Sequence, residues 1–147
     1  MKRMNNQLSG CERSLGFTLI ELLIVVVVLG IIMGIALPSY QNHVTKTHRT
    51  AAKACLSEYA NYMERFYTTH MRFDDGSENH QLPTLECASN GNTGRFYSYN
   101  VDAKANAYTL SASAIGAQAS RDVMCLKLTL DHKGKKDVDG GNTQDCW

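Results

Sequence analysis

The stretch that decides the fold runs from Gly16 to Pro38 and reads GFTLIELLIVVVVLGIIMGIALP. Its apolar part, residues 17–37, has 21 residues and includes one ionisable side chain, Glu21. At about 1.5 Å per residue, a helix of that length measures roughly 31 Å, close to the hydrocarbon thickness of a bilayer. We therefore expect a membrane-spanning helix. Its carboxylate needs a partner, because an unpaired charge is costly in hydrocarbon.

The segment before this helix is short, polar and lightly basic, like the first part of an export signal. A removable secretory signal has a small-residue cleavage site after its apolar run, and none follows here, so we expect the apolar segment to be retained as an anchor. The remaining chain is long enough for one domain. The net charge of the 147 residues is +1, which argues against a strongly basic nucleic-acid binder.

The cysteines indicate on which side of the membrane the domain lies. Cys11 precedes the anchor, and four follow it: Cys55, Cys87, Cys125 and Cys146. An even number on one side favours two disulfides in an oxidising compartment, outside the cytoplasm. The spacings contain no C-x-x-C and no nearby histidine pair, so we predict neither a metal site nor a cofactor. We expect Cys55–Cys87 and Cys125–Cys146 bonds, although four cysteines allow three pairings.

Helical periodicity resumes beyond Pro38, and a proline inside a long helix can kink it. An apolar stripe recurs at three- and four-residue spacing: Ala52, Cys55, Leu56, Tyr59, Ala60, Met63, Phe66 and Tyr67. This pattern predicts one continuous helix of roughly 50 residues, half in lipid and half packed on a domain.

Three strands are predicted after the helix, at residues 95–101, 107–115 and 123–130. In the third strand, one face is expected to carry Met124, Leu126, Leu128 and Leu130. Short connections favour an antiparallel meander, with loops at 102–107 and 116–122 and a turn at 131–137. The predicted fold class is α+β, with a long N-terminal helix packed on a small antiparallel sheet.

The segment from 16 to 44, GFTLIELLIVVVVLGIIMGIALPSYQNHV, resembles the N-terminus of type IV pilins. That family has a glycine at its cleavage point, then Phe-Thr-Leu-Ile-Glu, an apolar run and a proline. Further along, ACLSEYANYMERFYTTH, AYTLSA, CLKLTLDHKG and the final CW resemble PilE-type pilins, often minor subunits. The resemblance implies the type IV pilin fold, a class III (prepilin) leader at 1–16, a transmembrane and polymerisation segment at 17–44, and a head at 45–147.

The resemblance also implies a structural role in a pilus. Prepilin peptidase would cut between Gly16 and Phe17 on the cytoplasmic side and methylate the new amine of Phe17, and the leader would take Cys11 with it. The subunit would wait in the bacterial inner membrane as a single-pass protein with its head outside the cytoplasm. An assembly platform would then place it among other pilin subunits in an extracellular pilus. Adhesion, twitching motility and DNA uptake are roles of the family.

Cleavage would also supply the missing partner of Glu21. The amine of Phe17 would lie four residues away, or one helical turn, in the same chain, and a neighbouring chain offers the same group. This pair would set the register of staggered subunits, because a misaligned subunit would leave a charge buried and unpaired. Gly30 and Gly34 form a G-x-x-x-G, which permits close helix approach or local unwinding. The alternative is that Glu21 only favours a helix N-terminus.

The remaining polar signals are weaker. Lysines near the C-terminus offer a DNA contact, but interleaved aspartates cancel much of their field, so a solvated loop is the default. These residues are Lys127, Lys133, Lys135 and Lys136, and Asp131, Asp137 and Asp139. Contact with a host surface has no support in the sequence. Residues 137–145 resemble a calcium loop but lack its bidentate glutamate, so we expect a turn.

The scattered histidines have no nucleophile at a recognisable spacing, so we do not expect an enzyme. Two other functions stay open. A type II secretion pseudopilin would share the N-terminal segment, but the cysteine-closed C-terminus favours a pilus subunit. A non-polymerising, signal-anchored periplasmic binding or catalytic module would not be cut at Gly16 and would tolerate Glu21→Gln.

Overall fold

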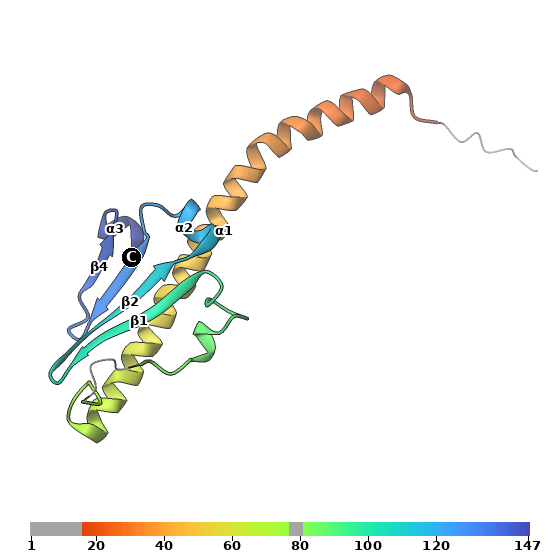
Figure 1. Cartoon of the computed structure of the whole chain (residues 1–147). Helices are drawn as coiled ribbons and strands as arrows, with labels where there is room; N and C mark the ends of the chain where they lie inside the picture. Colours follow the sequence, from red (N-terminus) through yellow and green to blue (C-terminus); the bar gives the residue numbers. More distant parts are fainter. Residues whose placement is uncertain (1–15, 77–80) are drawn as a thin grey trace, which may run out of the picture. The chain divides into compact units, whose positions relative to one another are not determined.

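The computed structural model describes residues 16–76 and 81–147, so Cys11 and nearly all of the predicted leader lie outside the described part. The chain divides into a first unit that ends at Pro38 and a second unit, Ser39–Trp147, which we call the head. The head contains most of the long helix, a sheet and three short helices (Figure 1). The predicted functional division between residues 44 and 45 stays a prediction.

The long helix, α1, extends over Leu19–His70 and has 52 residues, close to the predicted length. Every side chain from 16 to 43 is exposed, whereas the part of α1 in the head buries one stripe. Of the predicted stripe, Ala52, Cys55, Leu56, Tyr59 and Met63 are buried, and the other three residues are half-buried. Tertiary packing against the sheet therefore stabilises this half of the helix.

The sheet has four strands: β1 (Tyr97–Lys104), β2 (Ala107–Ala114), β3 (Lys127–Asp131) and β4 (Lys136–Asp139). They are ordered β1-β2-β3-β4, and each neighbouring pair is antiparallel. Leu110 lies opposite Val101 on one side and Leu130 on the other, and these inward residues pack with α1 in a single core. The predicted α+β fold with an antiparallel meander is confirmed.

The third predicted strand was wrong at its start. β3 begins at Lys127, and Met124 and Leu126 are 59% and 39% exposed. The cause is the disulfide of Cys125, which is itself buried. Two exposed residues separate Cys125 from the buried Leu128, so the alternation of the strand does not extend back to this segment.

All three predicted connections contain regular structure. β1 begins two residues after the start of the predicted strand 95–101 and continues to Lys104, so the predicted loop 102–107 is reduced to a turn at residues 105–106. Residues 116–122 include helix α2 (Gly116–Arg121), whose Gln118 is buried against α1. The C-terminal turn region contains β4 and helix α3 (Thr143–Cys146), where the Asn142 side chain accepts a hydrogen bond from the Gln144 N–H. β4 has one half-buried apolar residue, Val138, so no sequence alternation marks it.

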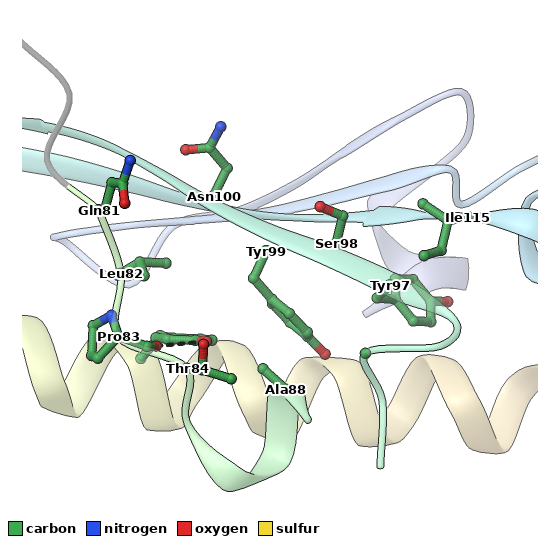
Figure 2. A pocket seen from close by; sticks show the side chains of 12 residues that line it. Gln81, Leu82, Pro83, Thr84, Ala88, Tyr97, Ser98, Tyr99, Asn100 and Ile115 are labelled. Atoms are coloured by element: carbon green, nitrogen blue, oxygen red, sulfur yellow. Dashed lines mark hydrogen bonds between the residues drawn. The ribbon is translucent and has the colours of Figure 1, made fainter. Parts of the chain in front are cut away.

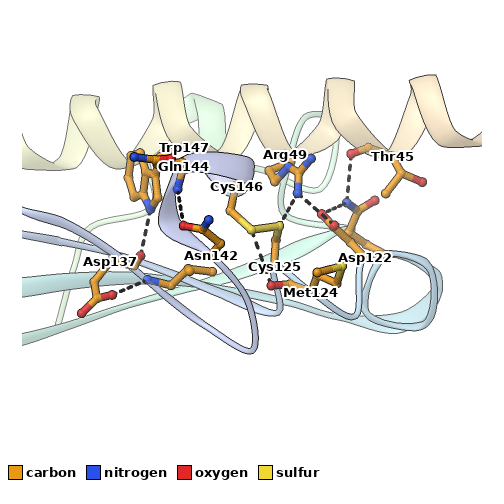
Figure 3. Close-up of a disulfide and its surroundings, with 12 residues drawn as sticks. Thr45, Arg49, Asp122, Met124, Cys125, Asp137, Asn142, Gln144, Cys146 and Trp147 are labelled. Carbon is orange, nitrogen blue, oxygen red and sulfur yellow. Dashed lines mark hydrogen bonds and ion pairs between the residues drawn. A yellow bond between two sulfur atoms is a disulfide. The ribbon is translucent and has the colours of Figure 1, made fainter.

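Two disulfides close the head in the same pairing as the sequence-based expectation. Cys55–Cys87 joins α1 to the short 3₁₀ helix η1 (Glu86–Ala88), and Cys125–Cys146 joins the segment before β3 to α3 (Figure 3). Their sequence separations are 32 and 21 residues. In the chain-entropy model, each loop closure stabilises the fold by roughly 3–4 kcal/mol.

Candidate functional site

The predicted cleavage junction lies at the start of the described chain. Gly16 is exposed, and Phe17 is 83% exposed. The Thr18 Oγ1 accepts a hydrogen bond from the Glu21 N–H at 3.3 Å, in the first turn of α1. Thr-x-x-Glu is the spacing of a helix capping box, and the helix dipole favours a negative charge at this end. This bond uses the backbone of Glu21, so the alternative interpretation, in which the Glu21 carboxylate only favours the helix N-terminus, stays a prediction.

Phe17 and Glu21 also line one shallow hollow of about 200 Å³, together with Leu22 and Val25. In the uncleaved chain the Phe17 nitrogen is an amide, whereas cleavage would make it a cationic amine on the same turn as the carboxylate. This arrangement suits the predicted ion pair, which itself stays a prediction.

The two glycines of the apolar segment, Gly30 and Gly34, are not required by packing within the described chain. A Cβ added at Gly30 or Gly34 would meet nothing within 4 Å. α1 continues through Pro38, and the predicted kink stays a prediction. Among the described residues, one helix, α1, is long and apolar enough to cross a membrane.

The head contains a buried polar network that the sequence did not reveal. Arg49 Nη1 lies 3.1 Å from Asp122 Oδ1, and both residues are buried. Gln118 Nε2 lies within hydrogen-bond distance of the Thr45 carbonyl (3.1 Å), the Tyr97 hydroxyl (3.0 Å) and Asp122 Oδ2 (3.3 Å). Arg49 also donates to the sulfur of Cys125 in the disulfide (Figure 3). The network therefore joins α2 and the following turn to α1.

Burial raises the pKa of two members of this network, Asp122 and Tyr97. It raises the pKa of the Asp122 carboxyl, while the charge of Arg49 and hydrogen bonds from Gln118 and Tyr97 act in the opposite direction. Burial also raises the pKa of Tyr97 to about 12, although the hydrogen bond with Gln118 opposes the shift. Tyr97 therefore keeps its hydroxyl proton at neutral pH.

Two groups of basic side chains lie on the head. The first, which we call the arginine surface, consists of His48, Arg95, Phe96 and Arg121. The His48 ring stacks on Phe96 with centroids 3.7 Å apart, and the Arg95 guanidinium lies 5.7 Å from the Phe96 centroid. Burial lowers the pKa of His48, and the nearby charges of Arg121 and Arg95 lower it further. Exposed cations beside an aromatic ring can bind phosphates and stack on bases.

The second group, the lysine surface, consists of Lys53, Lys133, Lys135, Lys136 and Trp147, whereas Lys127 lies on the other face of the sheet, opposite Asp139. The Lys136 ammonium lies 5.2 Å from the Trp147 ring centroid. Burial lowers the pKa of Lys53, as do the charges of Arg49 and Lys136, so α1 contributes a cation near the strand lysines.

Asp131, which precedes three of these lysines in the sequence, accepts hydrogen bonds from the backbone. Asp131 Oδ1 accepts hydrogen bonds from the N–H groups of Lys133 (2.9 Å) and Lys135 (2.8 Å), which hold the pKa of its carboxyl below the ordinary value. None of these lysines forms an ion pair with another residue in the part of the chain that the structure describes. Their ammonium groups are available to an anion.

One groove of the head differs from these surfaces because no charged residue lines it. It has a volume of about 500 Å³ and lies between residues 81–84 and β1. Figure 2 shows Tyr99 pointing from β1 toward α1, with Asn100 on the other side of the strand. The Tyr59 hydroxyl donates to the Pro83 carbonyl at 3.1 Å, and Tyr99 bonds Thr93 at 2.6 Å. These tyrosines help to hold the core and the loop.

The described residues contain no group of three or more His, Cys, Asp or Glu side chains that could hold a metal ion.

The exposed apolar helix and the disulfide-closed head on an antiparallel sheet define the chain as a type IV pilin. The family model of the prokaryotic N-terminal methylation motif matches residues 13–37. A second family model, described as type IV minor pilin ComP, DNA uptake sequence receptor, matches residues 38–129, and the chain belongs to this family.

Similarity to individual proteins agrees with this assignment. The chain is 45% identical to the fimbrial protein EcpC of Eikenella corrodens over 51 residues, 30% of this chain and 33% of that protein. It is 44% identical to the major fimbrial protein FimA of Dichelobacter nodosus over 52 residues, 28% and 33% of the two chains. The chain thus spans about a third of the length of these relatives.

Among solved structures, the non-core minor pilin PilV of Neisseria meningitidis shares the fold with a TM-score of 0.50. It is 18% identical to this chain, and the match covers 69% of this chain and 92% of PilV. The pseudopilin and the non-polymerising module are not favoured.

Proposed function

We propose that this chain is a minor pilin whose head binds double-stranded DNA on the pilus surface. The observation that carries the proposal is the match of residues 38–129 to a family described as a DNA uptake sequence receptor. The matched range covers the head from its first helical residues to β3. The proposal assigns the chain no catalytic role.

Prepilin peptidase is proposed to cut between Gly16 and Phe17 and to methylate the amine of Phe17. The exposed junction and the match of residues 13–37 to the N-terminal methylation motif support this step. The subunit would then be held in the inner membrane by residues 17–44 with its head outside the cytoplasm, where the two disulfides are stable. The inner-membrane assembly platform would transfer it to the filament.

Mass spectrometry of the mature protein should find a chain that begins at N-methylated Phe17, and an intact leader would contradict the processing step.

The Glu21–Phe17 pair is proposed to set the register of the subunits. This is supported by the position of the two residues one helical turn apart, where they line the same hollow. Glu21→Val should insert into the membrane but be depleted from filaments. Glu58→Val, which removes an exposed carboxylate from the head part of α1, is the matched control. Equal incorporation of both variants would remove the registry role.

DNA binding is proposed to use the arginine and lysine surfaces together. Each has exposed cations and an aromatic ring, Phe96 in one case and Trp147 in the other. The near-zero net charge of the chain does not oppose this, because phosphate contacts depend on where the cations lie. The sequence-based default of a solvated lysine loop stays a prediction. Two observations favour an anion contact over it: Asp131 accepts hydrogen bonds from backbone N–H groups, and Lys53 of α1 lies near Lys136.

Binding of a fluorescent duplex at several salt concentrations tests this proposal. Each phosphate contact that is lost should reduce the slope of log K against log salt by about 0.9. Arg95→Ala/Arg121→Ala and Lys133→Ala/Lys135→Ala should therefore each reduce it by roughly 1–2. Arg65→Ala, an equally exposed cation elsewhere on α1, should leave the slope unchanged. Equal slopes for all variants would contradict the assigned surfaces.

A further inference from the structure

His48 lies near two arginines that belong to different parts of the head. Its ring stacks on Phe96, with the ring centroids 3.7 Å apart and the ring planes inclined by 22°. The Arg95 guanidinium lies beside the same Phe96 ring, and Arg121 is near enough for its charge to lower the pKa of the His48 imidazole. The long helix α1, the segment before β1 and the end of α2 therefore each bring one basic side chain to the arginine surface.

Hydrogen bonds between these three elements fix the arrangement. The N–H of Ile115, the N-cap residue of α2, donates to the Phe96 carbonyl at 2.8 Å. Within α2, Gln118 donates to the Thr45 carbonyl of α1 at 3.1 Å, and Thr45 lies on the same turn of α1 as His48. The folded head therefore holds the His48 imidazole near both guanidinium groups.

The described residues supply no ion-pair partner for Arg95 or Arg121. The carboxylate that follows Arg121, Asp122, is buried and paired with Arg49. His48 is half-buried, and this burial lowers the pKa of its imidazole, as do the charges of Arg121 and Arg95. At neutral pH the imidazole is therefore mostly uncharged, because even the ordinary pKa of a histidine is only about 6.5.

A phosphate bound by the two arginines would reverse this balance. It would oppose the repulsion between the guanidinium groups and an imidazolium. It would also favour the charged form directly, because an opposite charge within about 4–6 Å raises the pKa of a histidine. Binding of the phosphate and binding of the proton then favour each other, and the coupling free energy is the same in both directions.

We propose that His48 takes up a proton when double-stranded DNA binds to the arginine surface, and that the resulting imidazolium contacts a DNA phosphate. The affinity for DNA therefore rises as pH falls through the range in which histidines titrate. This inference deepens the proposed function and rests on it. The lysine surface does not give this response, because lysines, with an ordinary pKa of about 10.4, stay protonated throughout that range.

Duplex binding at several pH values tests the proposal. The full-length chain in uncharged detergent micelles is titrated with the fluorescent duplex at constant salt between about pH 5.5 and 7.5, on both sides of the ordinary histidine pKa. Wild-type affinity should rise toward low pH at least about threefold more than the affinity of His48→Gln, since one proton contributes up to about tenfold per pH unit. His132→Gln, next to Lys133 of the lysine surface, is the matched control and should keep the wild-type response.

The outcomes separate the inference from the function on which it rests. Equal pH responses of wild type and His48→Gln would overturn the inference, and so would a response that His132→Gln alone abolishes. Absence of duplex binding by the wild-type chain at every pH would instead contradict the proposed function.

A spectroscopic measurement on the wild-type chain needs no substitution, so it decides even where His48→Gln fails to fold. The His48 ring is identified by NMR through its contact with Phe96, and its titration is followed with and without the duplex. A threefold coupling corresponds to a rise of about half a pH unit in the pKa of His48 when the duplex is bound. The pKa of the exposed His70, roughly 33 Å further along α1, should rise less. A His48 pKa that saturating duplex leaves unchanged would overturn the inference.

Discussion

The buried carboxylate of Asp122 offers the sharpest test of how the head is held together. It bonds Arg49 at 3.1 Å and accepts from Gln118 at 3.3 Å, and Asp122 and Arg49 are 7% and 9% exposed. Asp122→Ala would leave the Arg49 guanidinium buried without its counter-ion and would leave Gln118 with one acceptor fewer. Both effects act in the same direction and lower the free energy of unfolding.

The size of the effect follows from this geometry. Removal of one partner of a buried ion pair costs about 3–5 kcal/mol. The raised pKa of Asp122 shows that its ionisation already has a desolvation cost in the folded state, so the lower end of this range is expected. For a domain of the size of the head, a loss of about 3 kcal/mol corresponds to a decrease in Tm of roughly 10–20 °C.

The assay is thermal unfolding of the full-length chain in detergent micelles under non-reducing conditions, followed by circular dichroism. The control is Arg49→Met/Asp122→Leu, which removes both charges and replaces them with apolar groups of similar size. Because such replacements are often near neutral, the double variant should recover at least half of the lost stability. A Tm of Asp122→Ala within about 3 °C of wild type would refute the structural role assigned to the network.

Further outcomes follow from the same structure. The folded pKa of Asp122 lies above its unfolded value, so its contribution to stability is present below the unfolded pKa and is lost as pH rises through the folded pKa. In denaturant titrations, the free energy of unfolding of wild type minus that of Asp122→Asn should therefore decrease as pH rises above the ordinary pKa of an aspartate, and an increase would contradict the sign. Cys146→Ser/Cys125→Ser should lower the free energy of unfolding by about 2–5 kcal/mol, and an unchanged denaturation midpoint would be inconsistent with the disulfide's role. Leu128→Ala, at a fully buried position opposite Val138, should lower the free energy of unfolding by about 2–5 kcal/mol. Thr129→Ala, at the next position, should lower it by less than about 1 kcal/mol.

The elements with strong periodicity could be predicted from the sequence. The stripe from Ala52 to Met63 has the helical period because that face packs on the sheet, and β2 alternates because one face contacts α1. The junction at Gly16 and Phe17, with Glu21 near the start of an apolar run, was specific enough to indicate the family. These signals are local, so a single sequence contains them.

The features that sequence reasoning missed depend on distant residues. Arg49 and Asp122 are 73 positions apart, and neither lies in an apolar pattern. β4 is a short polar edge strand, and its pairing with β3 gives it its structure. The arginine surface exists because the fold brings His48 of α1 beside Phe96. The sequence did contain a signal for the later start of β3, namely Cys125. A buried cysteine in a disulfide interrupts the alternation of the strand.

Retention of duplex DNA by purified filaments tests the central proposal most directly. Filaments are sheared from wild-type cells and from cells that lack this chain, matched for total pilin, and incubated with labelled duplex. The account predicts that wild-type filaments retain DNA, that deletion filaments of equal mass lose most of this retention, and that the Arg95→Ala/Arg121→Ala chain fails to restore it. Equal retention by wild-type and deletion filaments would contradict the account.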